Sequence, residues 1–203
     1  CVFTGSATGH DAVYRDAAIT LGRLLADRRI ELVYGGGRVG LMGVIADAVM
    51  GAGGTVIGVI PKFLDAREVA HPSITDLRVV DSMHERKALM ADLSDGFIAM
   101  PGGLGTLDEL FEILTWAQLG LHTKPVGILN VAGYYDALLA FVEQMVSAGF
   151  VGEEHRRRIH VASDPAEARQ RVTEYLEQHG PYEIDLGSVD VVVRAGRVSE
   201  MVV

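Results

Sequence analysis

The residue with the most unusual predicted surroundings is Arg86. In a helix, positions 83, 86, 90 and 93 share one stripe, and the other three residues on it are Met83, Met90 and Leu93. An unpaired guanidinium among apolar side chains is unfavourable. Arg86 is therefore expected either to snorkel or form a buried ion pair as part of the fold, or to meet a phosphate or a carboxylate in a binding pocket.

Glu109 offers such a carboxylate. It falls in the first turn of the helix predicted after Met100, where the helix dipole favours an acidic residue whatever its function. The helical period places it on a stripe that faces away from the predicted core residues Leu107, Leu110 and Leu114. A carboxylate and a guanidinium that face one sugar are suited to glycoside chemistry, because the carboxylate can orient water or stabilise positive charge at the anomeric carbon.

Three glycine-rich turns follow predicted strands and would lie beside one another at one edge of a sheet. The most specific is 101–106, Pro-Gly-Gly-Leu-Gly-Thr, which opens the helix that carries Glu109. Exposed N–H groups at a helix start, together with the helix dipole, favour an anion such as phosphate, and Thr106 adds a hydroxyl. The other two turns are 35–40 and 4–9. Three such turns favour a nucleotide over an apolar ligand.

Residues 35–40 also satisfy the G-x-G-x-x-G pattern of dinucleotide-binding proteins. That type of site needs an acidic residue at the end of the next strand to hold a ribose. Here the next predicted strand runs into Pro61 and Lys62, and the first acidic residue after it is Asp65. NAD or FAD binding is therefore disfavoured, and the histidines lack metal-ligand spacing, so neither a cofactor nor a metal is expected.

Short apolar runs alternate with longer segments of helical period, and these elements must position the side chains above. The strands are predicted at 2–4, 31–34, 55–60, 77–80, 97–100, 126–129 and 159–161. Apolar runs with little polar alternation are typical of a parallel sheet covered on both faces. We therefore expect an α/β fold: a Rossmann-like, doubly wound, mainly parallel sheet with helices on both faces and a ligand site outside the carboxyl ends of the strands.

The length of 203 residues fits one nucleotide-binding domain, with a core at 1–180 and a tail at 181–203. In the tail, the segments 189–194 and 197–203 flank Ala195 and Gly196, which predicts a hairpin.

Charge and cysteine content indicate which partners the protein is expected to have and in which compartment it is expected to lie. Eighteen Lys and Arg against 27 Asp and Glu give a formal net charge of −9, which disfavours nucleic acid as the main partner. The apolar stretch 48–61 is too short and too rich in glycine to span a bilayer, which needs about 20 apolar residues. One cysteine forms no internal disulfide, so we expect a cytoplasmic protein with no membrane contact.

Two motifs taken together carry a family resemblance. The segments M-H-x-R-K at 83–87 and P-G-G-x-G-T-x-x-E at 101–109 resemble the LONELY GUY (LOG) family, the cytokinin riboside 5′-monophosphate phosphoribohydrolases. The likeness extends from Cys1 to about residue 150. It implies a homodimeric enzyme that hydrolyses the N-glycosidic bond of a nucleoside 5′-monophosphate, either an N6-substituted AMP or AMP itself, to the free base and ribose 5-phosphate.

The resemblance also implies roles for individual residues. Arg86 and Glu109 would be the catalytic pair. The turn and helix start that would bind phosphate and ribose comprise Gly102, Gly103, Leu104, Gly105, Thr106, Leu107 and Asp108. The remaining expected substrate contacts are Gly5, Ser6, Gly36, Gly37, Glu68, Met83, Lys87 and Thr115. Position 108 is usually glutamate in the family, and the aspartate here leaves the charge unchanged.

Two other functions were weighed against this one. Members of the family were formerly labelled lysine decarboxylase-like, but a pyridoxal phosphate enzyme needs a Schiff-base lysine in its pocket. Besides Lys87, only Lys62 and Lys124 are present, and neither lies in a supporting motif, so this activity is rejected. The alternative that stays open is a carrier protein of similar fold that holds a nucleotide or pterin-like cofactor without catalysis.

Overall fold

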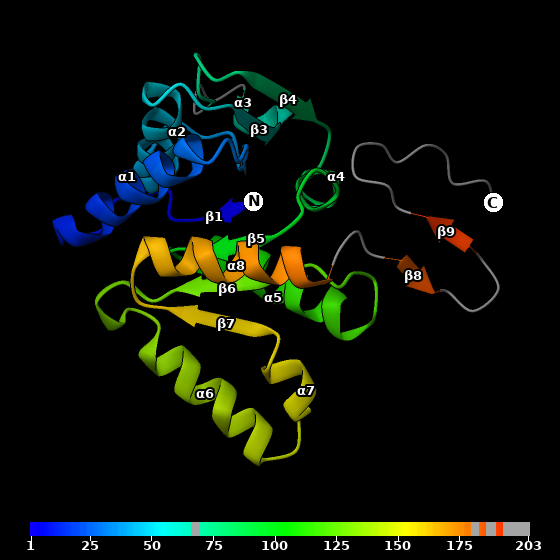
Figure 1. Cartoon of the computed structure of the whole chain (residues 1–203). Coiled ribbons are helices and arrows are strands. Elements are labelled where there is room, and N and C mark those ends of the chain that lie inside the picture. Colours follow the sequence, from blue (N-terminus) through cyan, green and yellow to red (C-terminus); the bar gives the residue numbers. More distant parts are fainter. Residues whose placement is uncertain (66–69, 180–182, 186–189, 193–203) are drawn as a thin grey trace.

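The computed structural model describes residues 1–65, 70–179, 183–185 and 190–192 (Figure 1). All the strands predicted from the sequence are present within this part of the chain. They are β1 (Val2–Phe3), β2 (Leu32–Tyr34), β3 (Val56–Pro61), β4 (Asp76–Val80), β5 (Phe97–Ala99), β6 (Val126–Leu129) and β7 (Ile159–Ala162).

These strands pair in parallel, as predicted, and their hydrogen bonds divide them into two sheets. One sheet has the order β2-β3-β4, and the other has the order β1-β5-β6-β7. The two sheets meet where β1 contacts β2. The chain therefore builds outward from β1 through β2 to β4 and then returns to the other side of β1 with β5. In sheets of this kind, such a reversal of strand order is where ligands bind.

Helices cover both faces, as the α/β prediction requires. The two faces are visible in β1 itself, because Val2 packs in one hydrophobic cluster and Phe3 in the other. The cluster around Val2 takes its helical residues from α1 (Ala12–Asp27), α2 (Gly40–Gly51) and α8 (Pro165–His179). The cluster around Phe3 takes them mainly from α4 (Met83–Asp92), α5 (Leu104–Gln118) and α6 (Asp136–Ser147).

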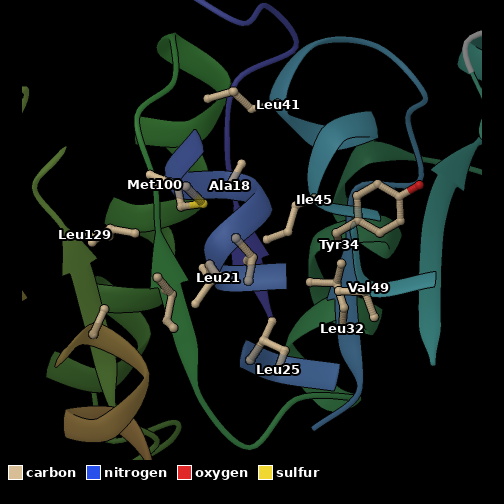
Figure 2. Close-up of a cluster of buried hydrophobic side chains, with 14 of the residues drawn as sticks. Ala18, Leu21, Leu25, Leu32, Tyr34, Leu41, Ile45, Val49, Met100 and Leu129 are labelled. Carbon is tan, nitrogen blue, oxygen red and sulfur yellow. The ribbon is translucent and has the colours of Figure 1, made fainter. Parts of the chain in front are cut away.

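Figure 2 shows the first of these clusters. Side chains of α1 project between the strands and α2, and the residues that meet there include Ala18, Leu21, Leu25, Leu32, Tyr34, Ile45 and Val49. All of them are at most 5% exposed, so the α1–α2 side of the sheet is a tightly packed support for the turns above it.

The short elements complete the described chain. They are α3 (Lys62–Asp65), the 3-10 turn η1 (Val131–Gly133), α7 (Glu153–Arg156), β8 (Glu183–Asp185) and β9 (Asp190–Val192). Strands β8 and β9 pair antiparallel, so a hairpin forms earlier in the tail than predicted. The second arm of the predicted hairpin, 197–203, lies outside the described residues. No helix in the described part of the chain is long and apolar enough to cross a membrane.

Helix α4 and helix α5 begin in different ways. At the start of α4 the Ser82 hydroxyl accepts the N–H of Glu85 at 3.1 Å, and the Glu85 carboxylate accepts the N–H of Asp81 at 2.8 Å. The residue before α5 is Gly103, which has no side chain to cap the helix. The first N–H groups of α5 therefore have no partner within the helix and no capping side chain.

The turn after β1 lies between the turns after β2 and β5. The Gly5 N–H donates to the Pro101 carbonyl at 3.2 Å, and the Gly5 carbonyl accepts the N–H of Met42 at 3.3 Å. Gly40 has φ +63°, and a Cβ on it would lie 2.2 Å from the carbonyl carbon of Ser6. Gly40 is therefore required both by its left-handed backbone and by the close approach of the first turn.

We predict that Gly40→Ala lowers the free energy of unfolding by about 2 kcal/mol or more, because it adds backbone strain to a steric clash. Gly51 at the other end of α2 has open space around it, so Gly51→Ala should leave stability unchanged or raise it by up to about 1 kcal/mol. Urea denaturation of the two variants measures the difference. Equal midpoints would contradict this account of how the turns pack.

Candidate active site

Helix α4 places Arg86 beneath the glycine-rich turns. The helix packs on β3, and the Arg86 Nε donates to the Val59 carbonyl at 3.0 Å. The residue is only 7% exposed. Directly after β2, Gly35 makes room for the guanidinium, since a Cβ there would lie 2.0 Å from Arg86 Nη2. Arg86 therefore occupies a fixed position that depends on a bare backbone at Gly35.

The predicted partner of Arg86 is present. Arg86 Nη1 lies 3.0 Å from Glu109 Oε1, and Glu109 is 8% exposed. The two residues are 23 positions apart in sequence and come from different helices, so the fold brings them together. The structure thus gives Arg86 a buried carboxylate, which is one of the partners that the sequence predicted for it.

The prediction that Glu109 faces away from the core was wrong. Glu109 is on the buried face of this helix, together with Thr106, Leu110 and Ile113. The leucines that suggested the core face include Leu107, which is only half-buried and lines an open groove. Leu110 is part of the core, and Leu107 and Leu114 pack against it while half-buried. The buried face of α5 is therefore wider than the leucine stripe and includes Glu109.

Burial and charge act on Glu109 in opposite directions. Removal from water disfavours the carboxylate and raises the pKa of Glu109 above its ordinary value, while the Arg86 guanidinium partly offsets this rise. The balance leaves a carboxyl group that takes up a proton more readily than an exposed glutamate does. Such a group is better suited to act as a general base than an exposed glutamate.

Lys87 joins the same two helices beside the pair. Its Nζ lies 3.1 Å from Asp108 Oδ2 and 3.0 Å from Glu112 Oε1, and its side chain is 11% exposed. Burial disfavours the ammonium, but the hydrogen bonds to Glu112 and Asp108 outweigh it and raise the pKa of Lys87. Lys87 therefore stays charged and fixes α4 against the start of α5.

The turn from Pro101 to Gly105 presents a bare backbone. A Cβ on Gly102 would lie 2.1 Å from the Thr106 hydroxyl, which is buried beneath it. Gly103 and Gly105 are exposed, and a Cβ on either would meet no atom within 4 Å. Because α5 has no N-cap side chain, this open turn leaves main-chain N–H groups available to an anion.

The glycines of the second turn have partners within the protein. The Gly36 carbonyl accepts the N–H of His71 at 2.9 Å, and Gly37 forms an antiparallel bridge with Ala70. Both glycines are buried, whereas Ser6 of the first turn is exposed at the rim. Glycine has a structural cause at two of the three positions: Gly35 makes room for Arg86, and Gly36 has φ +74°.

The other predicted contacts lie along α5 and α4. An open groove of about 650 Å³ follows the outer side of α5 and is lined by Leu104, Leu107, Asp108, Phe111, Glu112, Thr115 and Trp116. The Thr115 hydroxyl donates to the Phe111 carbonyl of its own helix at 2.7 Å. Met83 is half-buried at the start of α4. Glu68 lies outside the described residues.

Sequence reasoning missed three groups that hold the site together. They are Gly35 beneath the guanidinium, the Val59 carbonyl, and Glu112 as the second partner of Lys87. The glycine run did signal Gly35, but it was interpreted as ligand contact. The contact with the Val59 carbonyl could not be predicted, because every residue has a backbone carbonyl whatever its type.

The fold and these contacts define an α/β protein of the doubly wound type, with a buried arginine–glutamate pair near an open, glycine-rich turn. Residues 42–172 match the family model described as "Possible lysine decarboxylase". The rice protein "Cytokinin riboside 5′-monophosphate phosphoribohydrolase LOG" is 52% identical over 186 residues, which cover 92% of this chain and 76% of that protein. The enzyme LOG1 of the same description from Arabidopsis thaliana is 51% identical over 179 residues, covering 88% and 84% of the two chains. The chain therefore belongs to the LOG family.

Solved structures agree on the fold. The Moco carrier protein from Chlamydomonas reinhardtii superposes with a TM-score of 0.67 at 25% identity, over 87% of this chain and 96% of that one. The molybdenum cofactor binding protein from Rippkaea orientalis also gives a TM-score of 0.67, at 23% identity, over 86% and 95% of the chains.

The lysines do not fit the decarboxylase description of the family model. A Schiff base needs a free lysine amine at the site. Lys62 pairs with Asp81, Lys87 with Asp108 and Glu112, and Lys124 donates to the Ala91 carbonyl. Each lysine in the described part of the chain thus has an acidic or carbonyl partner. Nor do the described residues contain a group of three or more His, Cys, Asp or Glu that could hold a metal ion.

Replacing Arg86 by methionine removes the positive charge that favours the carboxylate form of Glu109. We predict that the pKa of Glu109 then rises further, so that its deprotonation moves to higher pH. Carbon NMR of labelled glutamate side chains follows this titration. Arg86→Lys should bring the midpoint back toward that of the wild type, and Arg156→Met, which breaks the exposed pair with Glu143, should leave it unchanged. An unchanged Glu109 midpoint in Arg86→Met would show that the two groups are not electrostatically coupled.

Proposed function

We propose that this protein hydrolyses the N-glycosidic bond of cytokinin riboside 5′-monophosphates, which are N6-substituted forms of AMP, or of AMP itself. The observation that carries the proposal is the buried pair of Arg86 and Glu109 at 3.0 Å, with Glu109 four residues after Gly105, where the open glycine turn ends. The activity named for relatives that are 52% and 51% identical supports the same conclusion.

The 5′-phosphate binds at the start of α5 in this proposal. The exposed N–H groups of Gly103, Leu104 and Gly105 and the positive end of the helix dipole meet the anion there. The wider substrate contacts stay as the sequence predicted them: Gly5, Ser6, Gly36, Gly37, Glu68, Met83, Lys87, Gly102, Thr106, Leu107, Asp108 and Thr115. Among these, Lys87 acts through Asp108 and Glu112 by holding the two helices together.

The reaction is a displacement by water at the anomeric carbon. The bond from this carbon to the base nitrogen breaks, its electron pair leaves with the base, and the water oxygen forms the new bond. Glu109 accepts a proton from the water and stabilises the positive charge that develops on the sugar. The base takes a proton from solvent, and the products are the free base and ribose 5-phosphate.

Arg86 keeps Glu109 in place during this step. Its bonds to Glu109 and to the Val59 carbonyl prevent the carboxylate from turning away, and its charge limits the rise in the pKa of Glu109. The pair therefore holds in place a carboxylate that is more basic than an exposed glutamate, as proton transfer from water requires.

The assembly in this proposal is a homodimer in the cytoplasm. The outer side of α5 exposes apolar side chains, with Leu104 86% and Leu119 68% exposed, beside the groove that holds Phe111 and Trp116. Contiguous apolar surface of this kind supports contact with a second copy of the chain. The single cysteine supports a compartment where disulfides are not needed.

Glu109→Gln should lower the rate of base release from AMP and from isopentenyladenosine monophosphate by about 10²–10⁴-fold, because glutamine accepts no proton. Binding of AMP, measured by calorimetry, should change far less, since the site keeps its shape. Glu143→Gln removes the acid of an exposed arginine–glutamate pair and serves as the control with full activity. Wild-type turnover in Glu109→Gln would refute the role given to Glu109.

Leu119→Glu should weaken the dimer at least about tenfold, because it places a charge in the apolar surface of α5. Sedimentation equilibrium over a range of concentrations measures this change. Phe150→Glu alters another highly exposed apolar residue, 83% exposed, beyond the end of α6, and should leave the dimer intact. If only the Phe150 variant dissociates, the dimer interface lies around Phe150, beyond the end of α6, and not on the surface of α5.

The second candidate function is a carrier that binds a nucleotide or pterin-like cofactor without chemistry. The likeness to the Chlamydomonas Moco carrier protein, at 25% identity, favours it. Release of free base from a nucleoside monophosphate decides between the two, because a carrier binds its ligand without turnover.

A further inference from the structure

A tyrosine that follows the neighbouring strand β6 contacts the glycine turn after β5. The Tyr134 hydroxyl donates to the Gly102 carbonyl at 2.5 Å, across 32 positions of sequence. Tyr134 is 44% exposed, and its ring packs edge-on against Tyr14 and Tyr135, with centroids 5.6 and 4.9 Å away. It therefore stands at the rim of the turn with its ring fixed on two sides.

The backbone before Tyr134 is shaped to hold it there. Ala132 and Gly133 have φ +50° and +72°, so the chain turns sharply after β6. The Asn130 side chain secures this turn, because its oxygen accepts the Tyr135 N–H and its amide donates to Asp136 Oδ1, each at 2.7 Å. A left-handed alanine is unfavourable, and such residues persist where the surrounding contacts enforce them.

The bond from Tyr134 orients one peptide group. The peptide between Gly102 and Gly103 is planar and trans, so its N–H points opposite to its carbonyl. By holding the Gly102 carbonyl toward itself, the Tyr134 hydroxyl turns the Gly103 N–H the other way. Glycines on both sides of this peptide would otherwise let it rotate with little steric restriction.

Tyr135 makes a nearly identical bond with a different consequence. Its hydroxyl donates to the Met100 carbonyl at 2.6 Å, and the residue is 2% exposed. The peptide held in this case leads into Pro101, which has no N–H. Tyr135 therefore supports the fold of the turn, whereas Tyr134 also directs a donor.

We propose that Tyr134 is a positioning residue that fixes the Gly102–Gly103 peptide so that the Gly103 N–H meets the substrate's phosphate. The inference rests on the function proposed above. In this proposal the Tyr134 hydroxyl, in the segment after β6, contributes to the affinity for the 5′-phosphate without touching a reacting atom.

The test compares Tyr134→Phe with Tyr135→Phe, each of which removes one hydroxyl. In Tyr134→Phe the KM for AMP should rise about five- to tenfold with kcat within about twofold, because a phosphate contact stabilises ground state and transition state alike. The inhibition constant of inorganic phosphate should rise by the same factor, and the melting temperature should change little. In Tyr135→Phe the melting temperature should fall, because a buried carbonyl loses its donor, while KM and the phosphate inhibition constant should change by less than about twofold.

An unchanged phosphate inhibition constant in Tyr134→Phe would overturn the proposal, as would equal changes in the two variants. If the wild type releases no base from AMP, calorimetric titration with ribose 5-phosphate replaces the kinetics. Weaker binding in Tyr134→Phe alone would then support the positioning role while the proposed reaction fails. Equal binding by both variants and the wild type would reject it.

Discussion

The buried ion pair of Arg86 and Glu109 is the contact on which the site depends. Two charges removed from water are costly, and breaking such a pair by deleting one partner costs roughly 3–5 kcal/mol in proteins generally. Here the cost is offset by the 3.0 Å contact and by the Val59 carbonyl, which takes another guanidinium donor. Room for the guanidinium exists only because position 35 is glycine. The position of the Arg86–Glu109 pair therefore depends directly on the backbone at Gly35 and Val59.

The arrangement of strands explains why these residues meet. Strands β1, β2 and β5 end beside one another, at the reversal of strand order, and each is followed by a glycine-rich turn. The turn after β5 leads directly into α5, which delivers Glu109, while α4 packs on β3 and delivers Arg86. Glycine serves two purposes in these turns: close packing at Gly40 and an open backbone at Gly103 and Gly105.

The sequence predicted the strands, the parallel α/β fold and the contact between Arg86 and Glu109, because apolar period and the isolation of a charge are local signals. It placed Glu109 on the exposed face of α5, but the buried face of this helix extends beyond the leucine stripe and includes Glu109. It gave no sign of the Val59 carbonyl or of the bond from Tyr134 to Gly102. Those contacts depend on where backbone atoms lie after folding, and residue type does not encode them directly.

The division of the strands into two hydrogen-bonded sheets has a mechanical consequence. Arg86 is on α4, which packs on the β2-β3-β4 sheet, and Glu109 is on α5, which contacts the β1-β5-β6-β7 sheet. Their ion pair therefore connects the two sheets. The ion pairs of Lys87 with Asp108 and Glu112 connect the same two sheets. A small ligand bound over these ion pairs would contact both halves, and its binding would raise the free energy of unfolding of the whole molecule.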